Sequence, residues 1–232
     1  CPSCGYTTIK EYNKITKKYD AVRRCANDGF GCEKIAIEKI KHFISKDALN
    51  IDGLGKKVIE KFWDLKFVNS PEDIFKLDYN KISNLDGWGK QSVSNLKYSI
   101  EKAREVTLDR FIFSIGIRHI GTENAKLIAD YSKTIENLLD IINKKNINEL
   151  SNIDGIGETQ IQSIEKFFKN KNNIIIINRL NKVLSIKKLE LNKKGKLKGK
   201  TFMFTGKLLN ISRAEAKSLV EKNSGKIIST VN

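Results

Sequence analysis

A short glycine-containing segment occurs four times between residues 48 and 185. The second glycine of each copy lies at position 55, 89, 121 or 157, so successive copies are 34, 32 and 36 residues apart. Each copy follows a short apolar-periodic stretch and precedes a helical one, as Val58, Ile59 and Phe62 illustrate after the first copy. One Gly-x-Gly segment can arise by chance, but four at near-constant spacing indicate a repeated structural unit.

The residues within each copy have separate physical roles. The first glycine permits the positive φ of a tight turn, and the second lets the backbone come close to a ligand. An apolar residue between them is predicted to pack between two helices. The first positions are Gly53, Gly87, His119 and Gly155, the apolar ones are Leu54, Trp88, Ile120 and Ile156, and the second glycines are Gly55, Gly89, Gly121 and Gly157. This pattern is typical of the helix-hairpin-helix motif.

The second helix of each unit is predicted to bind phosphate. Its first N–H groups have no partner within the helix, and its dipole places positive charge there. Lys56, Lys57 and Lys90 would add cationic side chains. Such contacts reach the nucleic-acid backbone rather than the bases. The predicted DNA-binding residues are Gly53, Gly55, Lys56, Lys57, Gly87, Gly89, Lys90, His119, Gly121, Gly155 and Gly157.

Two of the copies depart from this pattern. His119 replaces the first glycine of the third, and Glu158 follows the fourth where a basic residue would be expected. These two copies could serve packing or positioning without binding phosphate. The whole repeat could also be a helical bundle whose glycines only make tight turns.

All four cysteines lie in the first 32 residues, as Cys1-x2-Cys4 and Cys25-x6-Cys32. Four thiolates satisfy tetrahedral zinc and leave no open position, so this pattern predicts a structural zinc site. Residues 6–9 and 20–24 read as short strands that the metal would hold together. Disulfides or unrelated buried thiols are the alternatives. His42 is a spare candidate ligand, but its amphipathic stretch favours a histidine on a helix surface.

Charge is unevenly distributed along the 232 residues. The formal net charge is +16, with +4 in residues 1–47, +3 in residues 48–185 and +9 in residues 186–232. A basic chain favours a polyanionic partner, although a lysine-rich solvated surface would give the same total.

The longest aliphatic run, residues 174–177, is too short to cross a membrane. We expect a soluble intracellular protein, and a chain that opens on Cys1 is expected to be a fragment of a longer one.

Residues 186–232 predict a linker and an incomplete domain. Residues 186–199 are rich in lysine and read as an exposed linker. Residues 200–232 read as a β-α-β segment: a strand at residues 200–205, a helix that starts at Ser212 with Glu215 completing a capping box, and a strand at residues 226–231. The predicted fold class is therefore mainly α, with a four-cysteine finger (1–32), a helix-hairpin-helix domain (33–185), the linker and this truncated segment.

Together these modules resemble the C-terminal half of bacterial NAD-dependent DNA ligase. The likeness rests on the finger Cys1-Pro2-Ser3-Cys4-Gly5, the four hairpins with Gly116-Ile117-Arg118-His119-Ile120-Gly121, and a tail, from Gly199-Lys200-Thr201-Phe202 to Thr205-Gly206, that is similar to the start of a BRCT domain. The spacing of the second cysteine pair, the third hairpin and the short tail depart from the family pattern.

The resemblance implies a function for a parent protein and a narrower one for this chain. An upstream lysine would take AMP from NAD, with magnesium, and pass it to the 5′-phosphate of a nick during replication and repair. No Lys-x-Asp-Gly nucleophile motif occurs here, so this chain is expected to be inactive alone. It would bind nicked double-stranded DNA without sequence preference, as a cytoplasmic, nucleoid-associated monomer. The BRCT-like tail would provide protein contacts.

Two other functions fit the same residues. The chain could be a non-catalytic module that binds duplex or junction DNA in another repair protein, since helix-hairpin-helix units occur in several classes of protein. It could also be a zinc-ribbon scaffold that binds no nucleic acid.

Overall fold

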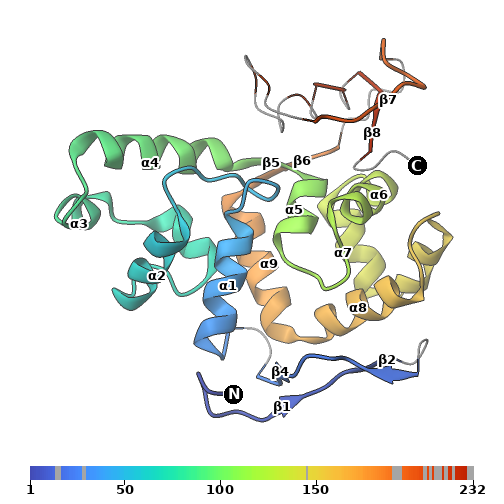
Figure 1. The fold of residues 1–232 in the computed structure, drawn as a ribbon, viewed down its shortest axis with the longest axis horizontal. Helices are drawn as coiled ribbons and strands as arrows, with labels where there is room; N and C mark the ends of the chain where they lie inside the picture. The colour runs from blue at the N-terminus through green and yellow to red at the C-terminus, as the bar shows by residue number, and fades with distance from the viewer. Residues whose placement is uncertain are drawn as a thin grey trace. The chain divides into compact units, whose positions relative to one another are not determined.

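The structure is a computed structural model that describes residues 1–13, 17–27, 30–144, 146–189, 195–205, 208, 211, 216, 219–220 and 223–228. These residues form two compact units, residues 1–188 and residues 189–232 (Figure 1). Helices make up most of the first unit, so the predicted mainly-α fold class is confirmed. None of the helices in the described ranges is both long and apolar enough to cross a membrane.

The N-terminal residues form a ribbon of two small antiparallel sheets. Strand β1 (Thr8–Ile9) pairs with β4 (Arg24–Cys25), and β2 (Tyr12–Asn13) pairs with β3 (Lys18–Tyr19). The strand predicted at residues 6–9 is present but shorter. The strand predicted at residues 20–24 is shifted, because β4 shares only Arg24 with it, and the β2–β3 hairpin was not predicted. Among the described residues before Cys32, none is buried, so the ribbon has no apolar core of its own.

Nine helices of the described part follow the ribbon, with two short 3-10 helices among them. The first helices of the hairpins are α1 (Glu33–Phe43), α3 (Tyr79–Ser83), α5 (Leu108–Ser114) and the 3-10 helix η2 (Ile147–Asn152). The second helices are α2 (Lys56–Asp64), α4 (Lys90–Ala103), α6 (Thr122–Ser132) and α8 (Glu158–Lys169). The 3-10 helix η1 (Pro71–Lys76), α7 (Ile135–Asn143) and α9 (Lys171–Val183) connect or close these units.

The core of the first unit is aliphatic and aromatic. Its largest fully buried side chains come from all parts of the helical region and include Phe43, Phe62, Phe111, Ile59 and Leu96. Short parallel strands β5 (Glu105–Thr107) and β6 (Ser185–Lys187) join the middle of the first unit to its C-terminal end. The predicted linker at residues 186–199 therefore begins within a strand.

Arg104 strengthens the β5–β6 junction by hydrogen bonding to backbone. Its guanidinium donates to the carbonyl oxygen of Val183 at 3.2 Å and to that of Phe75 at 2.8 Å. It also lies over the Phe75 ring. A planar guanidinium can serve several acceptors at once, so one side chain ties α4, η1 and the end of α9 together.

The second unit contains two parallel strands, β7 (Thr201–Phe202) and β8 (Lys226–Ile227). A parallel pair needs a crossover connection, which agrees with the predicted β-α-β order. The predicted helix start at Ser212 and Glu215, together with Gly206, Lys193 and Lys194, lies outside the described residues. The assignment of this segment to a BRCT-like domain stays a prediction.

Candidate nucleic-acid interface and metal centre

The four glycine segments adopt one backbone turn. The first residue of each has a positive φ: 89° at Gly53, 85° at Gly87, 61° at His119 and 91° at Gly155. In the last three copies, the N–H of the following apolar residue donates to the carbonyl three residues earlier, at 3.0 to 3.1 Å. This is the arrangement of a β-turn with its third residue in the left-handed region. His119 therefore takes the place of a glycine in conformation as well as in sequence.

Neighbouring hairpins also support the first glycine by packing. A Cβ atom on Gly53 would lie 3.5 Å from Leu96 of α4, and one on Gly155 would lie 3.1 Å from Leu127 of α6. Hairpin 1 thus rests on the second helix of hairpin 2, and hairpin 4 rests on that of hairpin 3. The predicted apolar residues Leu54, Ile120 and Ile156 are buried as expected. Trp88 is only partly buried, and its ring packs against Phe62 of α2 at a centroid distance of 5.7 Å.

The second glycine of each hairpin differs from the first residue in having a negative φ and in beginning a helix. Gly55, Gly89, Gly121 and Gly157 are the N-cap residues of α2, α4, α6 and α8, and their φ angles lie between −67° and −97°, which any residue adopts. A Cβ atom on Gly55, Gly89 or Gly121 would meet no described atom within 4 Å. Neither backbone conformation nor packing against the described residues calls for glycine there, so the space left by the missing side chain is available to a bound partner.

The starts of α2 and α4 are open and cationic. No side chain caps either helix, and neither first turn contains an acidic residue. Lys56 and Lys57 begin α2, and Lys90 begins α4, all of them exposed. Free N–H groups, a helix dipole and lysines converge at each start, which is a favourable environment for an anion.

The starts of α6 and α8 differ from these two. Glu123 lies in the first turn of α6, and Glu158 begins α8. The N–H of Gly157 donates to the side-chain oxygen of Gln160 at 3.2 Å, so the fourth hairpin satisfies one of its own donors. Burial and the neighbouring Arg118 lower the pKa of His119 below its ordinary value, so its ring is mostly neutral at pH 7 and adds no cation.

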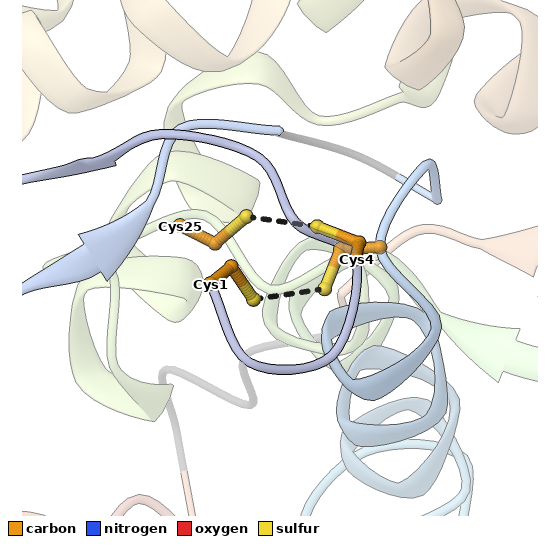
Figure 2. Close-up of side chains that lie close together, drawn as sticks. Cys1, Cys4 and Cys25 are labelled. Atoms are coloured by element: carbon orange, nitrogen blue, oxygen red, sulfur yellow. Dashed lines mark hydrogen bonds between the residues drawn. The ribbon is translucent and has the colours of Figure 1, made fainter.

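The four cysteines converge on one point. The Sγ atoms of Cys1, Cys4, Cys25 and Cys32 all lie within 4.8 Å of one another, and none is in a disulfide. Cys4 and Cys25 approach to 3.5 Å and Cys1 and Cys32 to 3.8 Å; Figure 2 shows the side chains of Cys1, Cys4 and Cys25 pointing toward a common centre. Tetrahedral zinc with bonds of about 2.3 Å would place sulfurs about 3.8 Å apart. The four cysteines can therefore hold a metal ion.

The surroundings of Cys4 favour its thiolate, which is the form that binds a metal ion. The backbone N–H of Tyr6 donates to Cys4 and lowers the pKa of its thiol, whereas burial raises the pKa of Cys25. The side-chain amide of Asn27 also donates to Cys4. Hydrogen bonds of this kind orient metal ligands from outside the coordination shell.

His42, the spare candidate ligand, is used elsewhere. Its Nε2 lies 2.8 Å from the carbonyl oxygen of Phe113, and its ring meets the Phe113 ring edge to face at 4.6 Å. His42 thus joins α1 to the end of α5. Of the described residues, only the four cysteines group as possible metal ligands.

Sequence reasoning missed three contacts near these sites: the pairing of Arg118 with the ribbon, the cap from Gln160, and the His42–Phe113 contact. A glutamine three residues after an N-cap is a known capping signal and could have been read for Gln160. The other two join residues 71 or more positions apart, and no local pattern predicts them.

Comparison with known proteins agrees with this geometry. Residues 110–177 match the helix-hairpin-helix motif family, so the third and fourth hairpins are helix-hairpin-helix units. The whole chain also aligns with proteins named DNA ligase: 65% identical to that of Pelagibacter ubique, 40% to that of Rickettsia bellii and 35% to that of Neorickettsia sennetsu. It spans about a third of their length, 34%, 34% and 35% respectively. The chain is homologous to about a third of these DNA ligases, and the predicted resemblance to DNA ligase is confirmed.

Proposed function

We propose that the chain is the part of an NAD-dependent DNA ligase that binds nicked double-stranded DNA through backbone phosphates. The observation that carries this proposal is the pair of helix starts at Gly55 and Gly89. Both lack a side-chain cap, both have open space where a Cβ would lie, and both are followed by exposed lysines. The DNA ligase relatives, which align over the whole chain, support the same function.

Phosphate binding at these starts follows from simple electrostatics. The free N–H groups of the first turn of α2 and α4 donate to phosphate oxygens, and the helix dipoles add positive potential. Lys56, Lys57 and Lys90 neutralise the charge, and the absent Cβ lets the sugar-phosphate backbone approach. No base edge is read, so affinity is independent of sequence.

The third and fourth hairpins have a supporting role in this proposal. Glu123 and Glu158 repel phosphate at the starts of α6 and α8, and Gln160 already accepts a hydrogen bond from Gly157. Backbone donors at Gly121 remain open, so the third hairpin adds a weak contact. The fourth packs against the third and positions it.

The metal that we assign to the cysteines is zinc, in a structural role. Four thiolates complete a tetrahedral shell, so the ion would have no open position for substrate or water. When bound, it supplies cross-links between the ends of the ribbon, which lacks a core. The chain's own contribution is to present the four sulfurs at the spacing the ion requires.

The chemistry of nick sealing belongs to other parts of the parent protein. There, AMP from NAD would activate the 5′-phosphate with the help of magnesium, in replication and repair. Because this chain has no Lys-x-Asp-Gly motif, we propose that it binds DNA without sealing it. We place it in the bacterial cytoplasm with the nucleoid, as a monomer whose C-terminal unit is available for protein contacts.

Replacing Lys57 and Lys90 together by alanine tests the phosphate contacts. Each phosphate that a cation neutralises adds about 0.9 to the slope of log affinity against log salt for B-DNA. The double variant should therefore bind any duplex more weakly and show a slope lower by about 1 to 2.

Lys169→Ala is the matched control, because Lys169 is an exposed lysine at the other end of α8, paired with Glu165. Its slope should equal that of the parent chain. If Lys57→Ala/Lys90→Ala leaves affinity and slope unchanged at every salt concentration, DNA does not bind at α2 and α4.

A further inference from the structure

Arg118 is a basic residue within the third hairpin, one position before His119, yet its charge is engaged inside the protein. Its guanidinium forms ion pairs with two ribbon carboxylates, those of Glu11 and Asp20, and its Nη2 lies 2.5 Å from Asp20 Oδ2. We infer that Arg118 is a positioning residue, which fixes the third hairpin to the cysteine ribbon and binds no phosphate. The effect of Arg118 on DNA affinity rests on the proposed DNA-binding function, whereas its contact with the ribbon does not.

The ribbon presents these two carboxylates as a pair. Glu11 and Asp20 flank the β2–β3 hairpin, in which Tyr12 is paired with Tyr19. The backbone N–H of Asp20 donates to the carbonyl oxygen of Glu11 at 2.8 Å, so the two residues stand opposite each other. A planar guanidinium with several N–H donors can serve both carboxylates together, which a lysine ammonium does less well.

The fourth hairpin joins the same group of charges. Lys166 of α8 forms an ion pair with Glu11, and Arg24 of β4 lies 3.6 Å from Asp20. All four side chains of the Glu11–Asp20–Arg118–Lys166 cluster come from within the first unit. The cluster therefore connects the ribbon to both the third and the fourth hairpin.

A second contact supports the third hairpin from α1. Cys32, one of the four cysteines, is the N-cap of α1, and His42 near the end of that helix hydrogen bonds to Phe113, near the end of α5. Beyond this point, Gly116 has a positive φ, and a Cβ there would lie 3.5 Å from the His42 ring. The segment 113–118 is thus fixed at one end by α1 and at the other by the ribbon carboxylates.

Neutralising the two carboxylates distinguishes a positioning role of Arg118 from a phosphate contact, because the two roles predict different changes in DNA affinity. Arg118, Glu11 and Asp20 are each about a third exposed or less, at 34%, 28% and 27%. If Arg118 bound phosphate, neutralising the two carboxylates would free it and raise affinity for DNA. If Arg118 positions the hairpin, the same change loosens the hairpin and lowers affinity. The two roles predict opposite signs.

Hydrogen exchange of the zinc-loaded chain tests the contact without DNA. The N–H of Ile120 donates to Ile117 and that of Ala125 to Gly121, so both amides report on the third hairpin. Arg118→Ala and Glu11→Gln/Asp20→Asn should each speed their exchange about fivefold, and the combined variant should add nothing further. The amide of Trp88, in the second hairpin, should be unchanged, as should every amide in the control Lys144→Ala.

Duplex binding by the same variants tests the consequence. Arg118→Ala and Glu11→Gln/Asp20→Asn should both lower affinity about three- to fivefold, although one removes positive charge and the other removes negative charge. Opposite shifts, with the carboxylate variant binding more tightly, would overturn the inference, as would unchanged exchange at Ile120 and Ala125. If the parent chain binds no duplex at all, the proposed function fails, and the exchange result alone decides the role of Arg118.

Discussion

Replacing Gly55 and Gly89 by alanine should lower affinity for duplex DNA by about tenfold to a hundredfold while the fold persists. Both positions have φ angles that alanine accepts, and a Cβ there meets no described atom within 4 Å. The added methyl groups would instead face the incoming DNA backbone. They would weaken charge-assisted hydrogen bonds worth about 1.5–3 kcal/mol each. The loss should be the same for every duplex sequence.

Two further glycine variants separate DNA contact from strain. Gly157→Ala should leave affinity close to that of the parent, because Gln160 already serves that N-cap. Gly87→Val places a branched residue at a φ of 85°, so it should lower both stability and affinity for every duplex. Fluorescence anisotropy measures the affinities, and circular dichroism verifies the helices. Equal affinity of Gly55→Ala/Gly89→Ala and the parent would rule out phosphate binding at these helix starts.

Removing the metal should unfold the ribbon and spare the helical region. Among its described residues before Cys32, none is buried, and its strands are only two residues long. The free energy that orders residues 1–32 must then come mainly from metal binding. Cys25→Ser, or chelation under reducing conditions, should reduce bound zinc from about one ion per chain to none. Trypsin should then cut rapidly at Lys17, Lys18 and Arg23.

His42→Ala is the matched control for the metal site. His42 bonds to Phe113 rather than lying with the cysteines, so this variant should keep its zinc and its resistant ribbon. Elemental analysis gives the metal content, and mass spectrometry of the tryptic fragments locates the cuts. A ribbon that stays protease-resistant after the metal is gone would contradict a structural metal site.

Local chemistry made the hairpins and the metal site predictable. A Gly-x-Gly segment specifies a turn and a helix start within a few residues, and four clustered cysteines specify a shared site. Even the substitution of His119 for glycine left the turn intact, with a φ of 61°. The contacts that hold this turn, of His42 with Phe113 and of Arg118 with the ribbon, join residues distant in sequence. The sequence therefore did not predict them.

The unpredicted features depend on neighbours that the sequence does not reveal. No local pattern predicts the partners of Arg118, because Glu11 and Asp20 lie 107 and 98 positions away in the sequence. His42 looked like a surface residue because its helix is amphipathic, and the carbonyl of Phe113 is its partner. The ring of Trp88 packs against Phe62, which belongs to another hairpin.

Binding of the chain to nicked duplex, intact duplex and single strand across a salt series is the decisive test of whether these hairpins bind the DNA backbone. We expect duplex binding without sequence preference, with log affinity falling linearly against log salt and the slope giving the number of phosphates that are neutralised. Single strands should bind more weakly. Absence of duplex binding at low salt, or affinity that does not change with salt, would contradict the proposal that these hairpins bind the DNA backbone.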